Sequence, residues 1–465
     1  MMQHMAEDAT RQAIQTAAEH ARAGLFLASQ GRVAEAVVHL SRWAALQPQS
    51  FEAHYNFGRA LRDLRQHEHA AAEFRAAVRL NPAFAPAWNN LGNTLRDLAA
   101  LDEAMECYDK ALELRPNHAP TYHNLALLFQ DRLQTTDAMR AFDKAIELKS
   151  DYAEALAGRA MLQLLLGDYE NGWRGYEARW AVPQALPPRG FSQPFWDGSD
   201  LKGKTVLLHA EQGFGDTIQF CRYAPLVAQR GAEPIVECQP ELRTLLGALP
   251  GVRQVMARGE PLPPFDLHCP LLGLPLRFGT TVVTIPASVP YLSADGGRIA
   301  QWREKLAVER AFRIGIVWSG AAGYGNDRRR SLHLSMLASL ARIESVQWYS
   351  LQKGDAARQA EHAPHGMRLI DLTADLHDFA DTAALITHLD LVICVDTAVA
   401  HLAGAMGKAV WTLLPLSPDW RWMLGREESP WYPTMRLYRQ PAWGDWASVI
   451  EQVAGDLCRH IRSLS

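Results

Sequence analysis

Two carboxylic acids follow a short apolar run in the stretch KTVLLHAEQGFGDTIQF, residues 204–220. Asp216 comes directly after Gly215, and Glu211 lies earlier in the same turn. A buried strand that runs into a glycine-containing turn delivers the residues of that turn to the carboxyl edge of its sheet, where α/β proteins bind ligands. A carboxylate at that edge can act as a general base. We therefore expect Asp216 to take a proton from a substrate, with Glu211 as a second candidate.

The glycines of this turn also suit a different function, the binding of a dinucleotide phosphate. That fingerprint needs a small residue three positions after Gly215 and an acidic residue about 20 positions further on. Glu237 stands near the second position, but Ile218 occupies the first and would crowd the approach of a pyrophosphate. We therefore interpret the two glycines as a flexible turn that brings Asp216 to a cleft, with Gly215 near the bound ligand.

A second group of polar residues stands in the segment VDTAVAHLAGAMG, residues 395–407. Asp396 ends an apolar strand, Thr397 opens a helix, and His401 follows one turn later. The free amides and the dipole at a helix N-terminus favour an anion. Asp396 could instead be a plain N-cap, which is common. That alternative leaves Thr397 and His401 unexplained, so we expect an anionic ligand here.

Cationic and amide side chains follow two further strands of the same region. Arg330 ends a run of three arginines after FRIGIVWSG, and Gln352 and Lys353 follow WYSL. Guanidinium and ammonium groups suit the oxygens of a diphosphate. A solvated charge run and an ordinary surface lysine are the alternatives.

A repeat of 34 residues fills the first part of the chain. The window that begins at Ala85 places small residues at the helix crossing and large apolar residues between hairpins, as in a tetratricopeptide repeat: Trp88, Leu91, Gly92, Leu95, Ala104, Tyr108, Ala111 and Pro116. The pattern recurs one period earlier and one period later, with weaker copies at both ends. It predicts an α-helical solenoid of about five helical pairs.

Asparagines at positions 56, 90 and 124 repeat with the same period, although helix packing does not require them. Asn56, Asn90 and Asn124 fall on the first helix of each pair, which lines the concave face of such a solenoid. A row of amides there can bind the backbone of an extended peptide. Common ancestry of the repeats and local helix contacts are the alternative explanation.

The pattern changes after residue 182 from helical hairpins to alternating strands and helices. A proline-rich segment, 183–199, precedes two series of apolar, β-branched runs and amphipathic helices, which indicate parallel sheets covered on both faces. We expect a repeat domain at 1–182, a linker at 183–199, and two Rossmann-like domains at 200–300 and 301–465.

Composition narrows the function classes. The 465 residues carry a formal net charge of −4, which disfavours a nucleic-acid partner. The six cysteines form no metal-ligand spacing, which is typical of a reducing compartment. The start lacks the apolar core of a signal peptide, and no uncharged run approaches the ~20 residues of a membrane span. We expect a cytoplasmic protein.

The segments GDTIQFCRYAPLVAQRG and VDTAVAHLAGAMGKAV resemble the heptosyltransferase family of glycosyltransferases, with Ala398 where that family has glycine. The resemblance implies a GT-B fold, in which two Rossmann-like domains face a cleft. The repeats joined to such a region are similar in layout to O-linked N-acetylglucosamine transferases.

The resemblance also implies a reaction. Asp216 would be the general base of an inverting transfer from a nucleotide-sugar, with Asp396, Thr397 and His401 beside the donor diphosphate and Arg330 or its neighbours at the phosphates. We expect no metal, because the chain has no DxD pair to hold Mg²⁺ or Mn²⁺. We also expect no bound cofactor, and a protein acceptor recruited by the repeats. A lipid-linked or carbohydrate acceptor, and an inactive scaffold that still binds nucleotide, are the alternatives.

Overall fold

The computed structural model describes residues 2–183, 189–306, 311–321, 327–343 and 346–464, with side chains from residue 15 to residue 463. The chain forms two compact units, Met1–Gly158 and Arg159–Ser465. Residues 184–188 of the predicted linker and 322–326 of the loop before the three arginines lie outside the described residues. None of the helices in the described ranges has both the length and the apolar composition needed to cross a bilayer.

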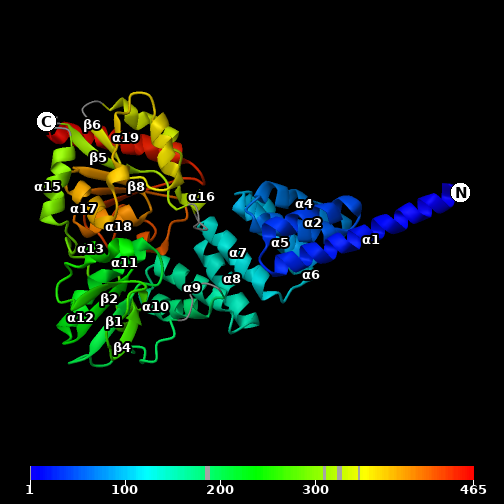
Figure 1. The fold of residues 1–465 in the computed structure, drawn as a ribbon, viewed down its shortest axis with the longest axis horizontal. Helices are drawn as coiled ribbons and strands as arrows, with labels where there is room; N and C mark the ends of the chain where they lie inside the picture. The colour runs from blue at the N-terminus through cyan, green and yellow to red at the C-terminus, as the bar shows by residue number, and fades with distance from the viewer. Residues whose placement is uncertain (1, 184–188, 307–310, 322–326, 344–345, 465) are drawn as a thin grey trace. The chain divides into compact units, whose positions relative to one another are not determined.

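The first unit is a right-to-left succession of helical hairpins, drawn from blue to cyan in Figure 1. Its helices are α1 (Met2–Ser29), α2 (Val33–Leu46), α3 (Phe51–Asp63), α4 (His67–Leu80), α5 (Ala85–Asp97), α6 (Leu101–Leu114), α7 (Ala119–Asp131), α8 (Thr135–Leu148) and the start of α9 (Ala153–Leu165). Glycines set the distance within the hairpins: a Cβ on Gly92 would lie 2.6 Å from the Tyr108 ring. The predicted solenoid and the packing role of Gly92 are confirmed.

The second unit begins within α9 and includes α10 (Tyr169–Tyr176) and the 3₁₀ turn η1 (Glu177–Ala181). The Trp173 indole donates to the carbonyl of Thr280 at 3.0 Å, and the Tyr169 ring stacks on Trp431. The last helix of the repeat pattern therefore packs with the α/β region. The sequence predicts a repeat domain that ends at residue 182, because the helical pattern of the repeats continues through α10.

A sheet of four parallel strands follows, in the order β3-β2-β1-β4. Its strands are β1 (Thr205–His209), β2 (Glu233–Cys238), β3 (Gln254–Ala257) and β4 (Leu267–Pro270). Most positions of β1 and β2 are buried, because helices cover both faces of such a sheet. The segment after β1 is not one continuous helix. It divides into α11 (Phe214–Phe220), a 3₁₀ turn and α12 (Ala224–Gln229), which has a proline in its first turn.

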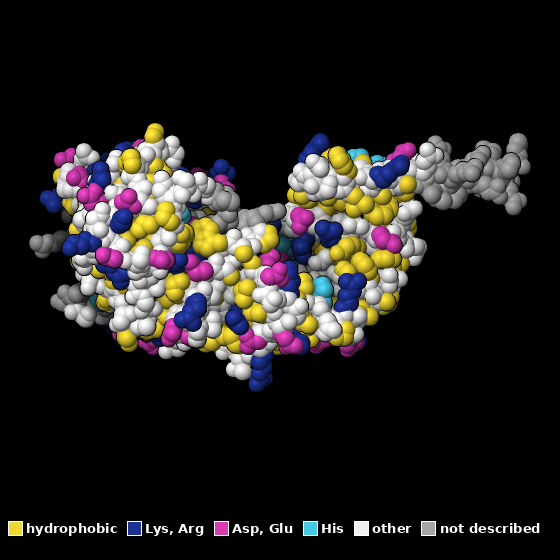
Figure 2. Space-filling model, turned by 90° about the horizontal axis from the view of Figure 1, so that it is seen from below, with side chains coloured by type: hydrophobic (Ala, Val, Ile, Leu, Met, Phe, Trp, Pro, Cys, Tyr) yellow, Lys and Arg dark blue, Asp and Glu magenta, His cyan; other side chains and the backbone are white. Residues whose placement is uncertain are grey.

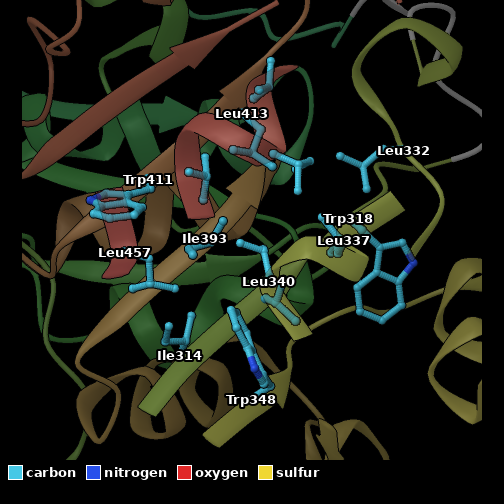
Figure 3. Packing of buried hydrophobic residues seen from close by; sticks show 14 of the residues in the cluster. Ile314, Trp318, Leu332, Leu337, Leu340, Trp348, Ile393, Trp411, Leu413 and Leu457 are labelled. Carbon is cyan, nitrogen blue, oxygen red and sulfur yellow. The ribbon is translucent and has the colours of Figure 1, made fainter. Parts of the chain in front are cut away.

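The second sheet has six parallel strands in the order β10-β9-β8-β5-β6-β7. They are β5 (Phe312–Val317), β6 (Val346–Ser350), β7 (Leu369–Asp371), β8 (Leu391–Val395), β9 (Val410–Leu414) and β10 (Met435–Arg439). On one face, α19 (Trp446–Leu464) and the 3₁₀ segment η5 (Leu334–Arg342) cover a core in which Ile314, Trp348 and Leu457 lie together (Figure 3). The predicted pair of parallel-sheet units is confirmed.

The order of the strands marks the ligand-binding edges of both sheets. The chain runs from β5 through β6 to β7 and then returns to β8 on the other side of β5. Ligands of open α/β sheets bind at such a reversal, outside the carboxyl ends of the strands. In the first sheet, β1 lies between β2 and β4 in the same way.

The surface carries both charge signs. On the face shown in Figure 2, Lys and Arg side chains alternate with Asp and Glu, and the described surface there shows no extended basic patch. This distribution agrees with the small net charge of −4.

Candidate functional site

The reversal point of the second sheet brings Arg330 and Asp396 together. Asp396 directly follows β8, and Nη1 of Arg330, at the end of α16 (Asp327–Arg330), donates to its carbonyl oxygen at 2.9 Å. Burial raises the pKa of the Asp396 carboxyl to about 6, and nearby Asp419 adds to the shift while Arg330 opposes it. The sequence placed these two residues at one edge, and the structure does the same.

Thr397 stands at the N-cap of α18 (Ala398–Ala405) with a buried hydroxyl that lacks a partner among the described residues. The buried indole N–H of Trp422 likewise forms no hydrogen bond of normal geometry there, although it lies near enough to favour the charged form of Asp396. Buried polar groups normally have partners. The buried, unpartnered hydroxyl of Thr397 at a helix N-terminus makes this turn a candidate place for a ligand or water.

His401 does not line an open site, contrary to expectation. Its side chain is buried, its Nδ1 shares a hydrogen bond of 2.9 Å with the Tyr432 hydroxyl, and its ring stacks on Trp422. Burial lowers the pKa of His401 well below its usual value, and Arg421, Arg222 and Arg330 add to this effect. The imidazole is therefore neutral and holds helix α18 in place.

Gly213 and Gly215 do not form the flexible turn that the sequence suggested. Gly213 is the N-cap of α11, and Gly215 lies inside that helix. A Cβ on Gly215 would lie 2.8 Å from Cδ2 of His401 and 3.7 Å from the Cα of Ala398. Gly215 thus permits close contact between α11 of the first sheet's half and α18 of the second, and His401 takes the space beside it.

Asp216 lies at this contact between the two halves. Its Oδ2 accepts from the Gly213 amide at 2.8 Å, and its Oδ1 accepts a hydrogen bond from Arg421. Its side chain is 17% exposed, so it remains within reach of solvent. Burial raises the pKa of Asp216, opposed by Arg421 and assisted by Asp419. A basic carboxylate with partial access suits the expected general base.

Glu211 has a structural position instead of the catalytic one considered for it. Both of its oxygens pair with Arg179, at 3.0 and 3.1 Å, and one also accepts from the Leu272 amide at 3.1 Å. The side chain is 2% exposed. Glu211 therefore ties η1 to the loops after β1 and β4, and its oxygens are not available to a substrate.

Gln352 and Lys353 also have backbone partners where phosphate contacts were expected. The buried amide of Gln352 accepts from the amides of Trp318 and Ser319 and donates to the carbonyls of Ser319 and Lys353. Lys353 donates to the carbonyls of Thr373 and Leu376 at 2.8 and 3.0 Å. Gln352 joins the loops after β5 and β6, so its amide has no remaining capacity for a phosphate.

The segment after β9 supplies residues that sequence reasoning missed. The 3₁₀ turn η8 (Trp420–Trp422) places Arg421 between Asp216 and Asp419. The tryptophans of this segment, Trp420, Trp422 and Trp431, are core residues. The position of Arg421 after a strand was the signal that could have identified it.

The asparagine row of the repeats is engaged in helix contacts. Asn90 accepts from Arg62 at 3.2 Å and donates to the Tyr55 hydroxyl at 3.0 Å, and Asn124 donates to Asn89 at 3.0 Å. Asn56 donates to a carbonyl of its own helix. These bonds agree with the alternative of local helix contacts.

A pocket of about 500 Å³ in the repeats lies elsewhere, between α4, α5 and α6. Trp88, Leu91 and Cys107 are among its lining residues, and none of the three asparagines is. The repeats therefore offer a hollow outside the asparagine row.

Comparison with known proteins agrees with this architecture. Residues 51–84 and 85–118 match tetratricopeptide repeat models, and residues 347–428 match the model of glycosyltransferase family 9 (heptosyltransferase). Protein FlbA of Caulobacter vibrioides is 27% identical over 324 residues, which cover 64% of this chain and 53% of FlbA. The match thus spans about half the length of that relative.

Several solved structures resemble part of the chain. MamA (residues 41 to the end) from Desulfovibrio magneticus RS-1 is 20% identical, with a TM-score of 0.32, and covers 36% of this chain and 93% of its own. Pseudomonas aeruginosa pilF is 21% identical, with a TM-score of 0.33, and covers 36% and 76%.

The family 9 match runs from β6 to just beyond η8 and contains the turn at Asp396 together with Arg421. The chain therefore combines tetratricopeptide repeats with an α/β region that carries a glycosyltransferase family 9 segment, and this match supports glycosyl transfer as its chemistry.

Proposed function

We propose that this protein is an inverting glycosyltransferase that moves a sugar from a nucleoside diphosphate sugar to a protein acceptor recruited by its repeats. The observation that carries the proposal is the ion pair between Asp216 and Arg421. Asp216 and Arg421 belong to the two halves of the α/β region, so this pair links the candidate base to the half that carries the Asp396 turn.

The donor diphosphate would bind at the N-terminus of α18. The backbone amides of its first turn, the unpartnered hydroxyl of Thr397 and the guanidinium of Arg330 lie together there. Amides and guanidinium groups arranged in advance stabilise the charge that develops on a leaving diphosphate. They would supply the positive charge that other glycosyltransferases obtain from a metal ion.

Asp216 would act as the base of a single displacement. The acceptor hydroxyl loses its proton to the Asp216 carboxylate while its oxygen forms a bond to the anomeric carbon. The bond from that carbon to the phosphate oxygen breaks, and its electron pair leaves with the diphosphate. One displacement inverts the configuration at the anomeric carbon. A correctly placed base contributes about 10²- to 10⁴-fold to such a rate.

A cavity of about 440 Å³ at the carboxyl edge of the first sheet is the candidate acceptor pocket. His209, Glu237, Arg258 and Trp180 line it, together with residues of the loop that leads to Asp216. Burial lowers the pKa of His209 to about 3, so its ring is a neutral hydrogen-bonding group. This polar lining also favours a carbohydrate acceptor as the second candidate.

A thermal-shift screen tests the donor site first. UDP, GDP and ADP, and UDP-glucose, UDP-N-acetylglucosamine, GDP-mannose and ADP-glucose, are each added to the full chain. A ligand that binds only the folded state raises the midpoint of unfolding, by an amount that grows with affinity. We expect at least one diphosphate to do so. No shift with any of them would contradict donor binding.

Asp216→Asn then separates binding from chemistry. We expect this variant to keep the thermal shift of the binding nucleotide and to lose release of diphosphate from the nucleotide-sugar. A variant with full release would remove Asp216 from the mechanism. A wild-type protein that binds nucleotide and turns nothing over, with either class of acceptor, would instead be a scaffold.

A further inference from the structure

Arg421 has one hydrogen bond on each nitrogen of its guanidinium group. Nε donates to Oε1 of Gln219 at 2.7 Å, Nη1 donates to Oδ1 of Asp419 at 2.8 Å, and Nη2 donates to Oδ1 of Asp216. Two of these acceptors, Asp216 and Gln219, lie on α11. A guanidinium group presents its donors in a planar fork, so three bonds in different directions define its orientation.

The surroundings of Arg421 restrict its movement. The side chain is 9% exposed, and its guanidinium carbon lies 4.3 Å from the centre of the Trp420 ring. Asp419 also accepts from the Arg421 backbone amide at 3.0 Å, so it holds both the turn and the side chain. Arg421 is therefore a rigid projection from the second half toward α11.

The Asp216 carboxylate is oriented from both halves. The Gly213 amide binds Oδ2 from within the first half, and Arg421 binds Oδ1 from the second. One oxygen is thus held by the helix that carries the aspartate, and the other by a residue more than two hundred positions further along the chain. Separation of the two halves would remove the second bond.

Charges around Asp216 make Arg421 important for its ionisation. Burial and Asp419 favour the protonated form of Asp216, whereas Arg421 favours the carboxylate. Glu211 and the Tyr176 hydroxyl also face it, the first as a further negative charge and the second as a neutral group. The positive charge of Arg421 therefore allows the Asp216 carboxylate to remain ionised although it is buried near other acids.

We propose that Arg421 is a positioning residue for the reaction, which orients the Asp216 carboxylate and holds it ionised from the opposite half of the α/β region. The base is then complete only when the two halves are in contact. This inference rests on the proposed function for its catalytic consequence, and its geometric part can be tested without activity.

The catalytic consequence is tested with Arg421→Met and Arg421→Lys. Arg298→Met is the matched control, because Arg298 also bridges two aspartates, Asp378 and Asp381, at 2.6 and 2.7 Å. Release of nucleoside diphosphate from the four nucleotide-sugars of the screen is measured between pH 5.5 and 8.5. We expect Arg421→Met to lose about tenfold or more in rate, within the range of a misplaced base, while Arg298→Met changes little.

The pH profile distinguishes positioning from simple destabilisation. Without Arg421, Asp216 ionises at higher pH, so the loss of rate in Arg421→Met is greater at pH 6 than at pH 8.5. Arg421→Lys retains the charge and should recover part of the rate at low pH. Equal losses at every pH, with no recovery by lysine, would overturn the proposal.

A second test uses stability alone. Asp216 has a higher pKa in the folded state than in the unfolded chain. Raising the pH from the unfolded pKa to the folded pKa therefore lowers the stability of the protein. Removal of Arg421 enlarges that loss of stability. The gap in unfolding midpoint between wild type and Arg421→Met should widen from pH 5 to pH 8. It should widen less when both proteins carry Asp216→Asn, where only the effect of Arg421 on Asp396 and His401 remains.

The two tests fail separately. A pH-dependent gap without turnover of any nucleotide-sugar would contradict the proposed function but retain the coupling of the two residues. A gap that does not change with pH, or that changes with pH just as much in the Asp216→Asn background, would overturn the coupling itself.

Discussion

A Cβ atom on Gly215 would lie 2.8 Å from Cδ2 of His401, closer than side chains approach one another. The two residues belong to α11 and α18, which follow β1 and β8 at the reversal points of the two sheets. His401 cannot easily move aside, because it stacks on Trp422 and is bonded to Tyr432. This contact determines how closely the candidate base and the candidate donor turn approach.

Gly215→Ala should therefore destabilise the α/β region by about 1–3 kcal/mol, the usual cost of overpacking a filled contact. Gly296→Ala is the control, because an added Cβ there meets nothing within 4 Å. Chemical denaturation of both variants measures the difference. Equal stabilities of the two variants would mean that α11 and α18 separate without cost.

His401 makes stability depend on pH in a direction that can be stated in advance. Its pKa is well below the usual value in the folded state, so the folded protein favours the neutral ring. The stabilisation is fully present above the unfolded pKa of about 6.5 and is lost as the pH falls toward the folded pKa. We expect His401→Gln to show a smaller loss of stability between pH 7 and pH 5 than wild type.

Unfolding midpoints at the two pH values measure this effect. His69→Gln, which removes an exposed histidine of the repeats, controls for the loss of one histidine. Identical pH dependence in His401→Gln and wild type would show that the His401 ring is charged or solvated.

The 34-residue repeat was sufficient to predict the solenoid, and the alternation of apolar runs with amphipathic helices was sufficient to predict the two parallel sheets. Both patterns follow from the apolar side chains that these elements bury. The rule that polar residues after strands lie at one edge correctly brought Arg330 to Asp396. The same rule does not predict which of these side chains form hydrogen bonds within the protein instead of with a ligand. Gln352 has its amide satisfied by the backbone of neighbouring loops, which only the three-dimensional structure reveals.

Contacts between the halves were also beyond sequence reasoning. Arg421 approaches Asp216 only because α11 and η8 are in contact in the folded protein. No local sequence pattern predicts that contact. In the repeats, a period of 34 residues predicted that the asparagines are equivalent in position. It did not predict that Asn90 bonds to Tyr55 of the preceding repeat.

The two acids of the β1–α11 turn should respond differently to the same change. Glu211→Gln removes a charge that pairs with the buried Arg179 from a side chain only 2% exposed. Breaking such a pair costs about 3–5 kcal/mol, reduced here because Arg179 keeps its pair with Glu177. Asp216→Asn changes a side chain that is 17% exposed and leaves Arg421 with Asp419, so it should cost less. We therefore expect the first variant to lose stability and the second to lose transfer. A stable Glu211→Gln protein without transfer would move the base to Glu211.

Arg330→Gln should weaken binding of the nucleoside diphosphate that the screen identifies. A hydrogen bond to a charged group contributes about 1.5–3 kcal/mol, so calorimetry should show roughly a 10- to 100-fold loss of affinity. Arg329→Gln is the control from the same helix, because its guanidinium lies 5.0 Å from the Trp443 ring instead of at Asp396. Equal affinities in the two variants would assign the phosphate contact to another cation. Unfolding midpoints of both variants without nucleotide must agree, because Arg330 also bonds to the Asp396 carbonyl and its loss could act through the fold of that turn.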